Sequence, residues 1–343
     1  MRFGHFDDAR REYVITTPQT PLPWINYLGS EDFFSLVSNT AGGYSFYRDA
    51  RLRRLTRYRY NSSPLDMDGH HIYIKDGGTV WNPGWQPTKT PLDRYSCRHG
   101  LGYTILEGEK DGICAAQELF VPKGDACELD RLTLTNRSDR PRELDVFSYV
   151  EFCLWDAVDD STNFQRNFST GEVEVEPGAI YHKTEYRERR DHYAVFWSNT
   201  PVTSFDTARD AFCGVYGGPA DPQAVRAGHC SGSIAHGWAP VGALHIHVTL
   251  APGEEKKILF GLGYIENPQE EKFTAPGVIN KTRAHAMMAR YADDAQVDAA
   301  RAALADHWES LLSTYRLQSG EEKLDRMVNL WHQYQCMVTF NMS

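Results

Sequence analysis

The sequence predicts a mainly β protein built around a large antiparallel sandwich, with helices confined to its last part. Short runs of alternating apolar and polar residues recur from residue 1 to about residue 280, separated by Gly and Pro. Few helical patterns interrupt these runs, which is typical of antiparallel sandwiches. Beyond residue 280 the apolar spacing changes to three and four residues, which indicates helices.

Two pairs of strands are predicted to form hairpins. Residues 144–152 alternate with period two, so one face should lie on a core, namely Leu144, Val146, Ser148, Val150 and Phe152. The polar turn 136–141 separates this strand from an earlier one at 132–135. A similar alternation over 245–250 precedes the turn 251–254 and a further strand at 257–260.

Two helices are predicted after residue 280. Asp293 or Asp294 can cap the first, whose apolar stripe includes Val297, Ala300, Leu304, Trp308, Leu311 and Tyr315. Gly320 separates it from a second stripe of Leu324, Met327, Val328, Trp331, Tyr334 and Val338. No capping glycine or polar tail follows this second stripe. We therefore expect it to face water or a neighbouring molecule, as in a chain that is cut there.

Composition excludes several classes of protein. The 343 residues include 36 Lys or Arg and 46 Asp or Glu, which gives a formal net charge of −10. Such an acidic chain is a poor non-specific binder of nucleic acid, because phosphate contacts require clustered cations. With 41% hydrophobic residues the chain can bury a substantial core, so disorder does not describe it.

Cysteine usage and the N-terminus predict the compartment. The seven Cys contain no CxxC pair, which favours buried thiols in a reducing compartment over disulfides or a zinc site. The N-terminus has no apolar signal-peptide region, and no apolar run approaches the length of a membrane span. We expect a cytoplasmic protein that binds neither membrane nor nucleic acid.

The long loop that follows the 144–152 strand is the richest candidate for function. It contains aromatic rings, carboxylates, amides and a guanidinium, including Trp155, Asp156, Asn163 and Arg166. Sugars bind such mixtures, because rings cover their C–H faces and polar groups satisfy their hydroxyls. The alternative is a solvated loop with Trp155 anchored in the core. Asp159 and Asp160 do not form a glycosidase pair, since adjacent residues of an extended chain point apart.

Two other segments contain residues that can bind ligands. If residues 51–60 form a strand, four arginines share one face, namely Arg51, Arg53, Arg57 and Arg59. This face can contact an anion, a sugar or a partner, or it can simply be solvated. His245 and His247 could share a metal, but no third ligand is evident, so no metal site is expected. Walker A, HExxH and GxSxG motifs are absent from the sequence.

The chain resembles the N-terminal part of the cellobiose phosphorylases of glycoside hydrolase family 94. The resemblance covers nearly the whole chain in order, from MRFGHFDDARREYVITTPQTPLPWINYLGSEDFFSLVSNTAGGYSFYRDARLRRLTRYRYN onwards. Further matching segments are RHGLGY at 98–103, VEFCLWDAVDDSTNFQRNFSTGEVEVE, IYHKTEYRERRDHYAVF and EKLDRMVNLWHQYQCMVTFNMS.

The resemblance implies an architecture and a reaction. It implies a β-supersandwich domain over 1–280, a helical linker over 281–318, and the first helix of a truncated (α/α)6 barrel over 319–343. The family reaction is reversible, inverting phosphorolysis of cellobiose to α-glucose 1-phosphate and glucose. Inorganic phosphate is then a co-substrate, and no cofactor is expected. The general-acid aspartate and most of the phosphate site lie in the barrel beyond this chain, so no residue here inherits a catalytic role.

The resemblance also implies substrate-binding residues and a partner. In the family the loop reaches the active-site entrance at a homodimer interface and contacts the acceptor sugar. This role falls first on Arg166, then on Asn163 and Asp156, with Trp155 beside them. Asp156 stands where Asn is common in the family, so its charge is expected to change acceptor preference. The alternatives are a related disaccharide or cellodextrin phosphorylase, or a stand-alone sandwich that binds carbohydrate or mediates dimerisation.

Overall fold

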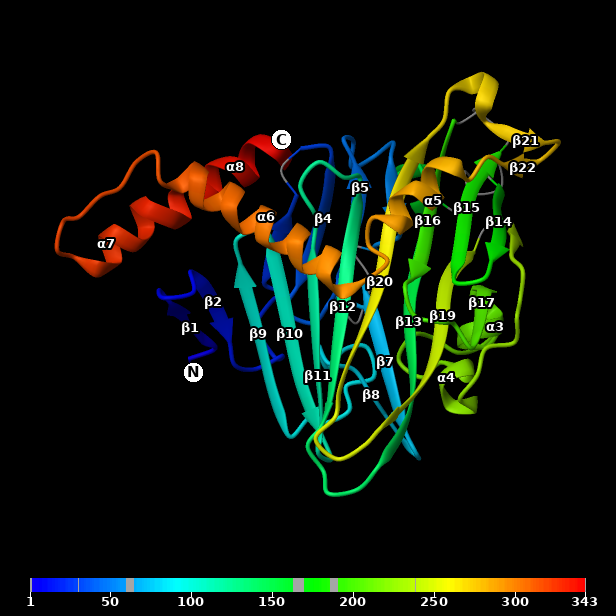
Figure 1. Cartoon of the computed structure of the whole chain (residues 1–343), viewed down its shortest axis with the longest axis horizontal. Helices are drawn as coiled ribbons and strands as arrows, with labels where there is room; N and C mark the ends of the chain where they lie inside the picture. The colour runs from blue at the N-terminus through cyan, green and yellow to red at the C-terminus, as the bar shows by residue number, and fades with distance from the viewer. Residues whose placement is uncertain are drawn as a thin grey trace.

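Two large antiparallel sheets dominate the computed structural model, which describes residues 2–29, 31–59, 65–162, 170–185, 191–237 and 239–342. They pack face to face around one main core (Figure 1). In spatial order the first sheet contains β1 (Gly4–Asp7), β2 (Glu12–Ile15), β9 (Arg94–Gly100), β10 (Tyr103–Lys110), β11 (Ile113–Phe120), β12 (Cys127–Asn136), β20 (Glu255–Glu266), β16 (His192–Ser198), β15 (Ala179–Glu185), β14 (Thr170–Glu176) and β18 (His236–Gly237).

The second sheet is organised around its longest strand, β13. Its main path contains β17 (Ser204–Ala208), β19 (Pro240–Leu250), β13 (Arg142–Trp155), β6 (Arg54–Thr56), β5 (Gly43–Tyr47), β4 (Phe33–Ser38) and β3 (Ile25–Leu28). Beside it, β7 (His71–Asp76) pairs with β13, and β8 (Thr79–Trp81) pairs with β7. A separate ribbon joins β21 (Phe273–Ala275) to β22 (Val278–Ile279). This confirms the predicted mainly β sandwich.

The two predicted hairpins are wrong, because each connection carries the chain from one sheet to the other. β12 pairs with β20, and β13 pairs with β19, so the connections 137–141 and 251–254 lie side by side. Asn136 joins them: its backbone N–H donates to the carbonyl of Glu254 (3.0 Å) and its side chain donates to Leu250 (3.1 Å). Alternation and turn residues predict a strand and a reversal, but they do not identify the partner strand.

β13 is buried on both of its faces. The even-numbered face lies in the main core as predicted, through Leu144, Val146, Val150 and Phe152. The opposite face is also covered, because Phe147 and Tyr149 form a separate cluster with Phe212 beneath two short helices, α3 (Arg209–Cys213) and α4 (Gln223–Ala227). A strand buried on both faces can therefore hold a charged side chain, Glu151, out of solvent.

The first predicted C-terminal helix is confirmed. After α5 (Thr282–Ala289), α6 (Asp294–Leu312) begins at Asp293, which accepts from the backbone N–H of Gln296 in a complete capping box. α6 lies across the outer face of the first sheet (Figure 1). Its buried residues are Val297, Leu304, Trp308 and Leu312. Leu311 and Tyr315, expected in the stripe, are 44% and 58% exposed.

The last helical segment packs on the sandwich, which corrects the expectation that its apolar stripe faces water. It comprises α7 (Glu322–Arg326), the π-helical turn η2 (Met327–Trp331) and α8 (His332–Met342). Leu330, Tyr334 and Val338 are buried with Trp308 in one cluster. Leu324 and Met327 are exposed instead. The second half of the predicted stripe, Trp331, Tyr334 and Val338, therefore forms the contacting face, whereas its first half does not.

Candidate functional site

The loop predicted to bind sugar starts from a rigid anchor, Trp155, at the end of β13. The Trp155 side chain is 0% exposed, and its ring lies parallel to that of His182, with centroids 6.2 Å apart. His192 contacts the same ring edge-on at 4.3 Å. Trp155 is therefore enclosed by the protein in this structure, and its role towards a sugar stays a prediction. The alternative prediction, an anchor in the core, is confirmed.

Asp156 begins the loop as a helix cap. Its Oδ1 accepts the backbone N–H groups of Val158 (2.9 Å) and Asp159 (3.0 Å), at the start of the short helix α1 (Ala157–Ser161). Its role towards a sugar stays a prediction. Asn163 and Arg166 lie outside the described residues, so the structure does not place them.

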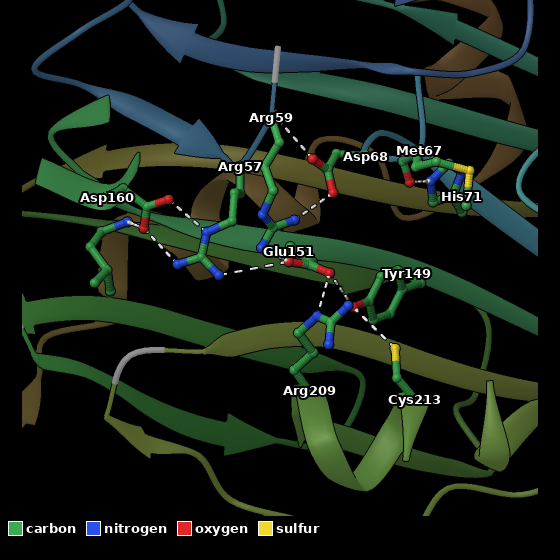
Figure 2. A network of polar contacts seen from close by, with 11 residues as sticks. Arg57, Arg59, Met67, Asp68, His71, Tyr149, Glu151, Asp160, Arg209 and Cys213 are labelled. Atoms are coloured by element: carbon green, nitrogen blue, oxygen red, sulfur yellow. Dashed lines mark hydrogen bonds and ion pairs between the residues drawn. The ribbon is translucent and has the colours of Figure 1, made fainter. Parts of the chain in front are cut away.

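Below the loop, a buried ion pair fixes the end of α1 (Figure 2). Arg57 donates through Nε to Asp160 Oδ2 (2.6 Å) and through Nη2 to Oδ1 (2.5 Å). The same Oδ1 accepts the backbone N–H of Leu154 at 3.2 Å. Both charged side chains are about 95% buried, since they are 4% and 5% exposed. The loop is therefore held at its base by a bidentate, fully desolvated contact.

Glu151 is the centre of this polar group. Its carboxylate accepts from Arg209 Nε (2.8 Å), Arg59 Nη2 (3.1 Å) and the hydroxyl of Tyr149 (2.9 Å), and lies 3.7 Å from Arg57 Nη1. Figure 2 shows Arg57 and Arg59 reaching it from one segment, directly after β6, and Arg209 from α3. Burial by itself raises the pKa of Glu151, but the arginine charges outweigh it and hold the pKa down at about 2.

The charges of this Glu151 network balance. It comprises Arg57, Arg59, Asp68, Tyr149, Glu151, Asp160 and Arg209. Arg59 completes it, because its backbone N–H and its Nη1 both donate to Asp68 at 2.7 Å. Nearby, burial lowers the pKa of His71 to about 4, so that imidazole stays neutral. Among the described residues of the network, three guanidinium groups face three carboxylates, so these charges balance.

This arrangement can position a loop but cannot supply a catalytic proton. Glu151 is ionised at neutral pH, and Asp160 is saturated by Arg57. Another carboxyl, Asp130, has its pKa raised by burial to about 7, but it lies inside the sandwich with 7% of its surface exposed. No sugar can reach it there.

The arginine run does not form one face, which corrects that prediction. Only Arg54–Thr56 is a strand, and its neighbours diverge. Arg57 points into the core, whereas Arg53 donates to Glu266 (3.0 Å) and to the hydroxyl of Tyr264 (2.9 Å). Arg54 lies over the ring of Tyr44 at 4.0 Å. Arg53 and Arg57 thus pair with carboxylates on different elements, Glu266 on β20 and Asp160 on α1.

The histidine pair on β19 shares a carboxylate. His245 Nε2 and His247 Nδ1 each lie 3.0 Å from Asp145 Oδ1. Among the residues that the structure describes, no cluster of three or more His, Cys, Asp or Glu side chains is arranged to hold a metal ion. Six of the seven cysteines are buried free thiols, as predicted, and Cys336 is exposed.

Sequence reasoning missed the Glu151 network. One signal was available: Glu151 interrupts an apolar strand, SYVEFCLW, where a lone carboxylate must find partners if it is buried. No local signal marked Arg209, which approaches from a helix 58 residues away. Its role depends on α3 packing over β13.

The fold defines a class of two-sheet supersandwich proteins with helices after the sandwich, and two solved structures share it. One is a putative kojibiose phosphorylase from the human microbiome, with TM-score 0.51 and 9% identity over 90% of this chain and 39% of that chain. The other is a bacterial glucoamylase complexed with acarbose, with TM-score 0.52 and 7% identity over 93% of this chain and 43% of that chain. At such identities the likeness shows the fold alone.

The chain belongs to glycosyl hydrolase family 94. Residues 11–294 match the supersandwich domain of that family, and residues 307–343 match its catalytic domain. An N,N'-diacetylchitobiose phosphorylase of Vibrio proteolyticus is 36% identical over 98% of this chain and 40% of its own length. A solabiose phosphorylase of Paenibacillus borealis is 36% identical over 74% of this chain and 33% of its own.

These relatives are phosphorylases of several disaccharides, and the chain spans 40% of the length of the chitobiose enzyme. A 3-O-β-D-glucopyranosyl-β-D-glucuronide phosphorylase of Paenibacillus borealis is 30% identical over 96% of this chain and 40% of its own length. The expected family is thereby confirmed, whereas the preference for cellobiose stays a prediction. None of the helices in the described part of the chain is long and apolar enough to cross a membrane.

Proposed function

We propose that the protein containing this sequence is an inverting disaccharide phosphorylase that converts cellobiose and phosphate to α-glucose 1-phosphate and glucose. The observation that carries the proposal is the family match, which covers the supersandwich over residues 11–294 and enters the catalytic domain at residue 307. The choice of cellobiose is supported by the sequence motifs of the N-terminal segment. The expected homodimer and cytoplasmic location belong to the same proposal.

The chemistry explains why one protein carboxyl is sufficient. An inverting hydrolase needs a second carboxylate to activate water on the far face of the sugar. Phosphate is already an anionic nucleophile, so a phosphorylase does without that base. A single general acid then protonates the glycosidic oxygen as the bond breaks. In this chain the Glu151 network would hold the acceptor loop, while the general acid and the phosphate clamp belong to the longer protein.

Two forms of the protein, the 343-residue chain and a longer chain, test the proposal. We expect the 343-residue chain to release no glucose 1-phosphate from cellobiose and phosphate, and a chain extended to the length of the relatives to do so. Purified preparations would be assayed with cellobiose, N,N'-diacetylchitobiose, laminaribiose and cellotriose. Phosphate-dependent turnover by the short chain would contradict the proposed division of labour. Inactivity of the extended chain towards every sugar would favour a sandwich that binds carbohydrate or mediates dimerisation.

The chitobiose relatives make N,N'-diacetylchitobiose the second candidate substrate. The same assay distinguishes the two candidate substrates, because the preferred one has the higher kcat/KM.

Arg166→Ala in the extended chain should weaken acceptor binding by about one to two decades if its guanidinium donates to a sugar hydroxyl. An unchanged KM for glucose in the synthetic direction would leave that residue without the proposed role. Size-exclusion chromatography with light scattering tests the dimer.

A further inference from the structure

A small polar cavity opens at the end of the sandwich where β13 and β20 finish. It has a volume of about 220 Å³ and is bordered by the start of β4, the end of β5 and the connection 121–126 between β11 and β12. The register places Tyr47 directly opposite Phe33 on the paired strands β5 and β4. The cavity is smaller than the ~300–1,000 Å³ typical of sites for drug-sized ligands, so it suits a single ring.

One wall of the cavity is a rigid aromatic surface. The ring of Tyr47 stacks on that of Tyr264, with centroids 4.0 Å apart and planes 8° from parallel. Tyr264 is fixed in turn, because its hydroxyl accepts from Arg53 (2.9 Å) and its ring contacts Trp155 edge-on at 5.9 Å. Tyr47 is therefore already ordered before any ligand arrives, which lowers the entropic cost of binding.

The Tyr47 hydroxyl is free to bind. Within the described parts of the chain it has no hydrogen-bond partner, and it is not among the buried polar atoms. A phenol donates one hydrogen bond and accepts another. The ring edge and the hydroxyl together offer what a pyranose needs, an apolar contact beside a polar group.

The other walls carry paired carboxylates. Glu31 accepts from Lys123 Nζ (2.5 Å) and from the backbone N–H of Gly124 (3.0 Å). Asp32 accepts a fork from Arg48, at 2.8 and 2.9 Å. These cations lower the pKa of both carboxyls, which stay ionised as hydrogen-bond acceptors for hydroxyl groups. Each pair is about half exposed, so unused lone pairs face the solvent side of the cavity.

The charge balance selects the class of ligand. Three carboxylates line the cavity, Glu31, Asp32 and Asp125, and Lys123 is the lining cation. Asp125 is held from outside by Arg290 at 2.6 and 3.0 Å. An anion such as phosphate would meet no unpaired cation among these groups. A neutral molecule with several hydroxyls would meet both acceptors and donors.

We infer that this cavity is a binding site for one neutral pyranose ring. Its Tyr47 wall adjoins Trp155 through Tyr264, so it lies at the same end of the sandwich as the candidate acceptor loop. Binding here does not require the general acid. The inference can therefore fail or hold whatever the longer protein catalyses.

Nuclear magnetic resonance of this 343-residue chain tests the site. The ²H,¹⁵N-labelled protein would be titrated with D-glucose, with sorbitol as the open-chain polyol, and with inorganic phosphate. We expect saturable shifts of the backbone amides in 121–126 with glucose, at least several-fold weaker binding of sorbitol, and no competition by phosphate. The absence of saturable shifts with glucose, or saturation by phosphate at the same amides, would overturn the inference.

Two variants and one control test whether glucose binds in this cavity. Tyr47→Phe removes the hydroxyl but keeps the stack on Tyr264, and should raise the Kd for glucose roughly threefold to tenfold. Asp32→Asn should weaken binding to a similar degree. Glu109→Gln is the control, because Glu109 on strand β10 pairs with Arg137 at 2.7 Å, outside the cavity. Equal glucose affinity in all three variants would place binding elsewhere and refute the site, provided that their spectra show the native fold.

Discussion

The hydroxyl of Tyr334, in the last helix, donates a hydrogen bond to the side-chain carbonyl of Asn26, in β3. The same hydroxyl accepts the backbone N–H of Tyr27 at 3.0 Å. Asn26 is itself fixed, since its amide donates to the carbonyls of Gly100 (2.9 Å) and Tyr103 (2.8 Å). One buried side chain thus ties the segment that matches the catalytic domain to the sandwich.

Removing that hydroxyl should loosen the last helix. Tyr334→Phe leaves the buried N–H of Tyr27 and the carbonyl of Asn26 without this partner, at a cost of about 1–3 kcal/mol. Chemical denaturation measures the loss, and hydrogen exchange over 327–342 should become faster. Tyr315→Phe is the control, because Tyr315 is 58% exposed and should change the free energy of unfolding by less than about 0.5 kcal/mol. Equal effects of the two substitutions would contradict the proposed tie.

Breaking the buried pair beneath the loop should cost more than breaking a surface pair. Arg57→Met leaves the buried carboxylate of Asp160 without its cation and removes one of three cations beside Glu151, which predicts a loss of about 3–5 kcal/mol. Arg137→Ala removes the exposed partner of Glu109 and should cost at most about 1 kcal/mol. Urea denaturation followed by circular dichroism gives both values. A loss below 1 kcal/mol for Arg57→Met would show that the network is not required for the fold.

The buried carboxyl of Asp130 should make stability depend on pH. Burial raises its pKa in the folded state to about 7, above the ~3.9 of an unfolded chain. Its neutral form therefore stabilises the fold at low pH, and that contribution is lost as the pH rises from about 4 to 7. Asp130→Asn keeps an acceptor for Gln117, whose amide donates to Asp130 at 2.8 Å, and cannot titrate.

The free energies of unfolding of the parent chain and of Asp130→Asn are compared at pH 5 and pH 8. Relative to the parent chain, Asp130→Asn should gain stability between pH 5 and pH 8, by an amount of order 1–3 kcal/mol. Asp139→Asn, at an exposed position between β12 and β13, is the control for the removal of one carboxylate. Parallel profiles of the parent chain and Asp130→Asn would contradict the assignment.

Variants of Asp156 distinguish a helix-capping role from a sugar-binding role. Asn is an equally good helix cap, so Asp156→Asn should keep stability within about 0.5 kcal/mol, whereas Asp156→Ala should lose about 0.5–2 kcal/mol. In the extended protein, Asp156→Asn should shift acceptor preference only modestly. If the Asn variant destabilises as much as the Ala variant, the carboxylate acts through its charge and not through the two backbone N–H groups of α1.

Local sequence determined those features whose causes lie within a few residues. The cap of α6 depends on Asp293 and Gln296, three positions apart, so its start could be predicted. The even-numbered core face of β13 likewise follows from alternation. The family was predictable because its motifs run through the whole chain.

Tertiary packing decided the rest, because the decisive partners are far apart along the chain. The turn 136–141 looks the same whether it joins neighbours in one sheet or connects two sheets, and only the pairing of β12 with β20 separates these cases. The charge of Glu151 is tolerated because Arg59 and Arg209, 92 and 58 residues away, reach it inside the protein. The last helix turns Leu330 and Tyr334 inward because Asn26 and Trp308 lie beneath them, a contact that no local period encodes.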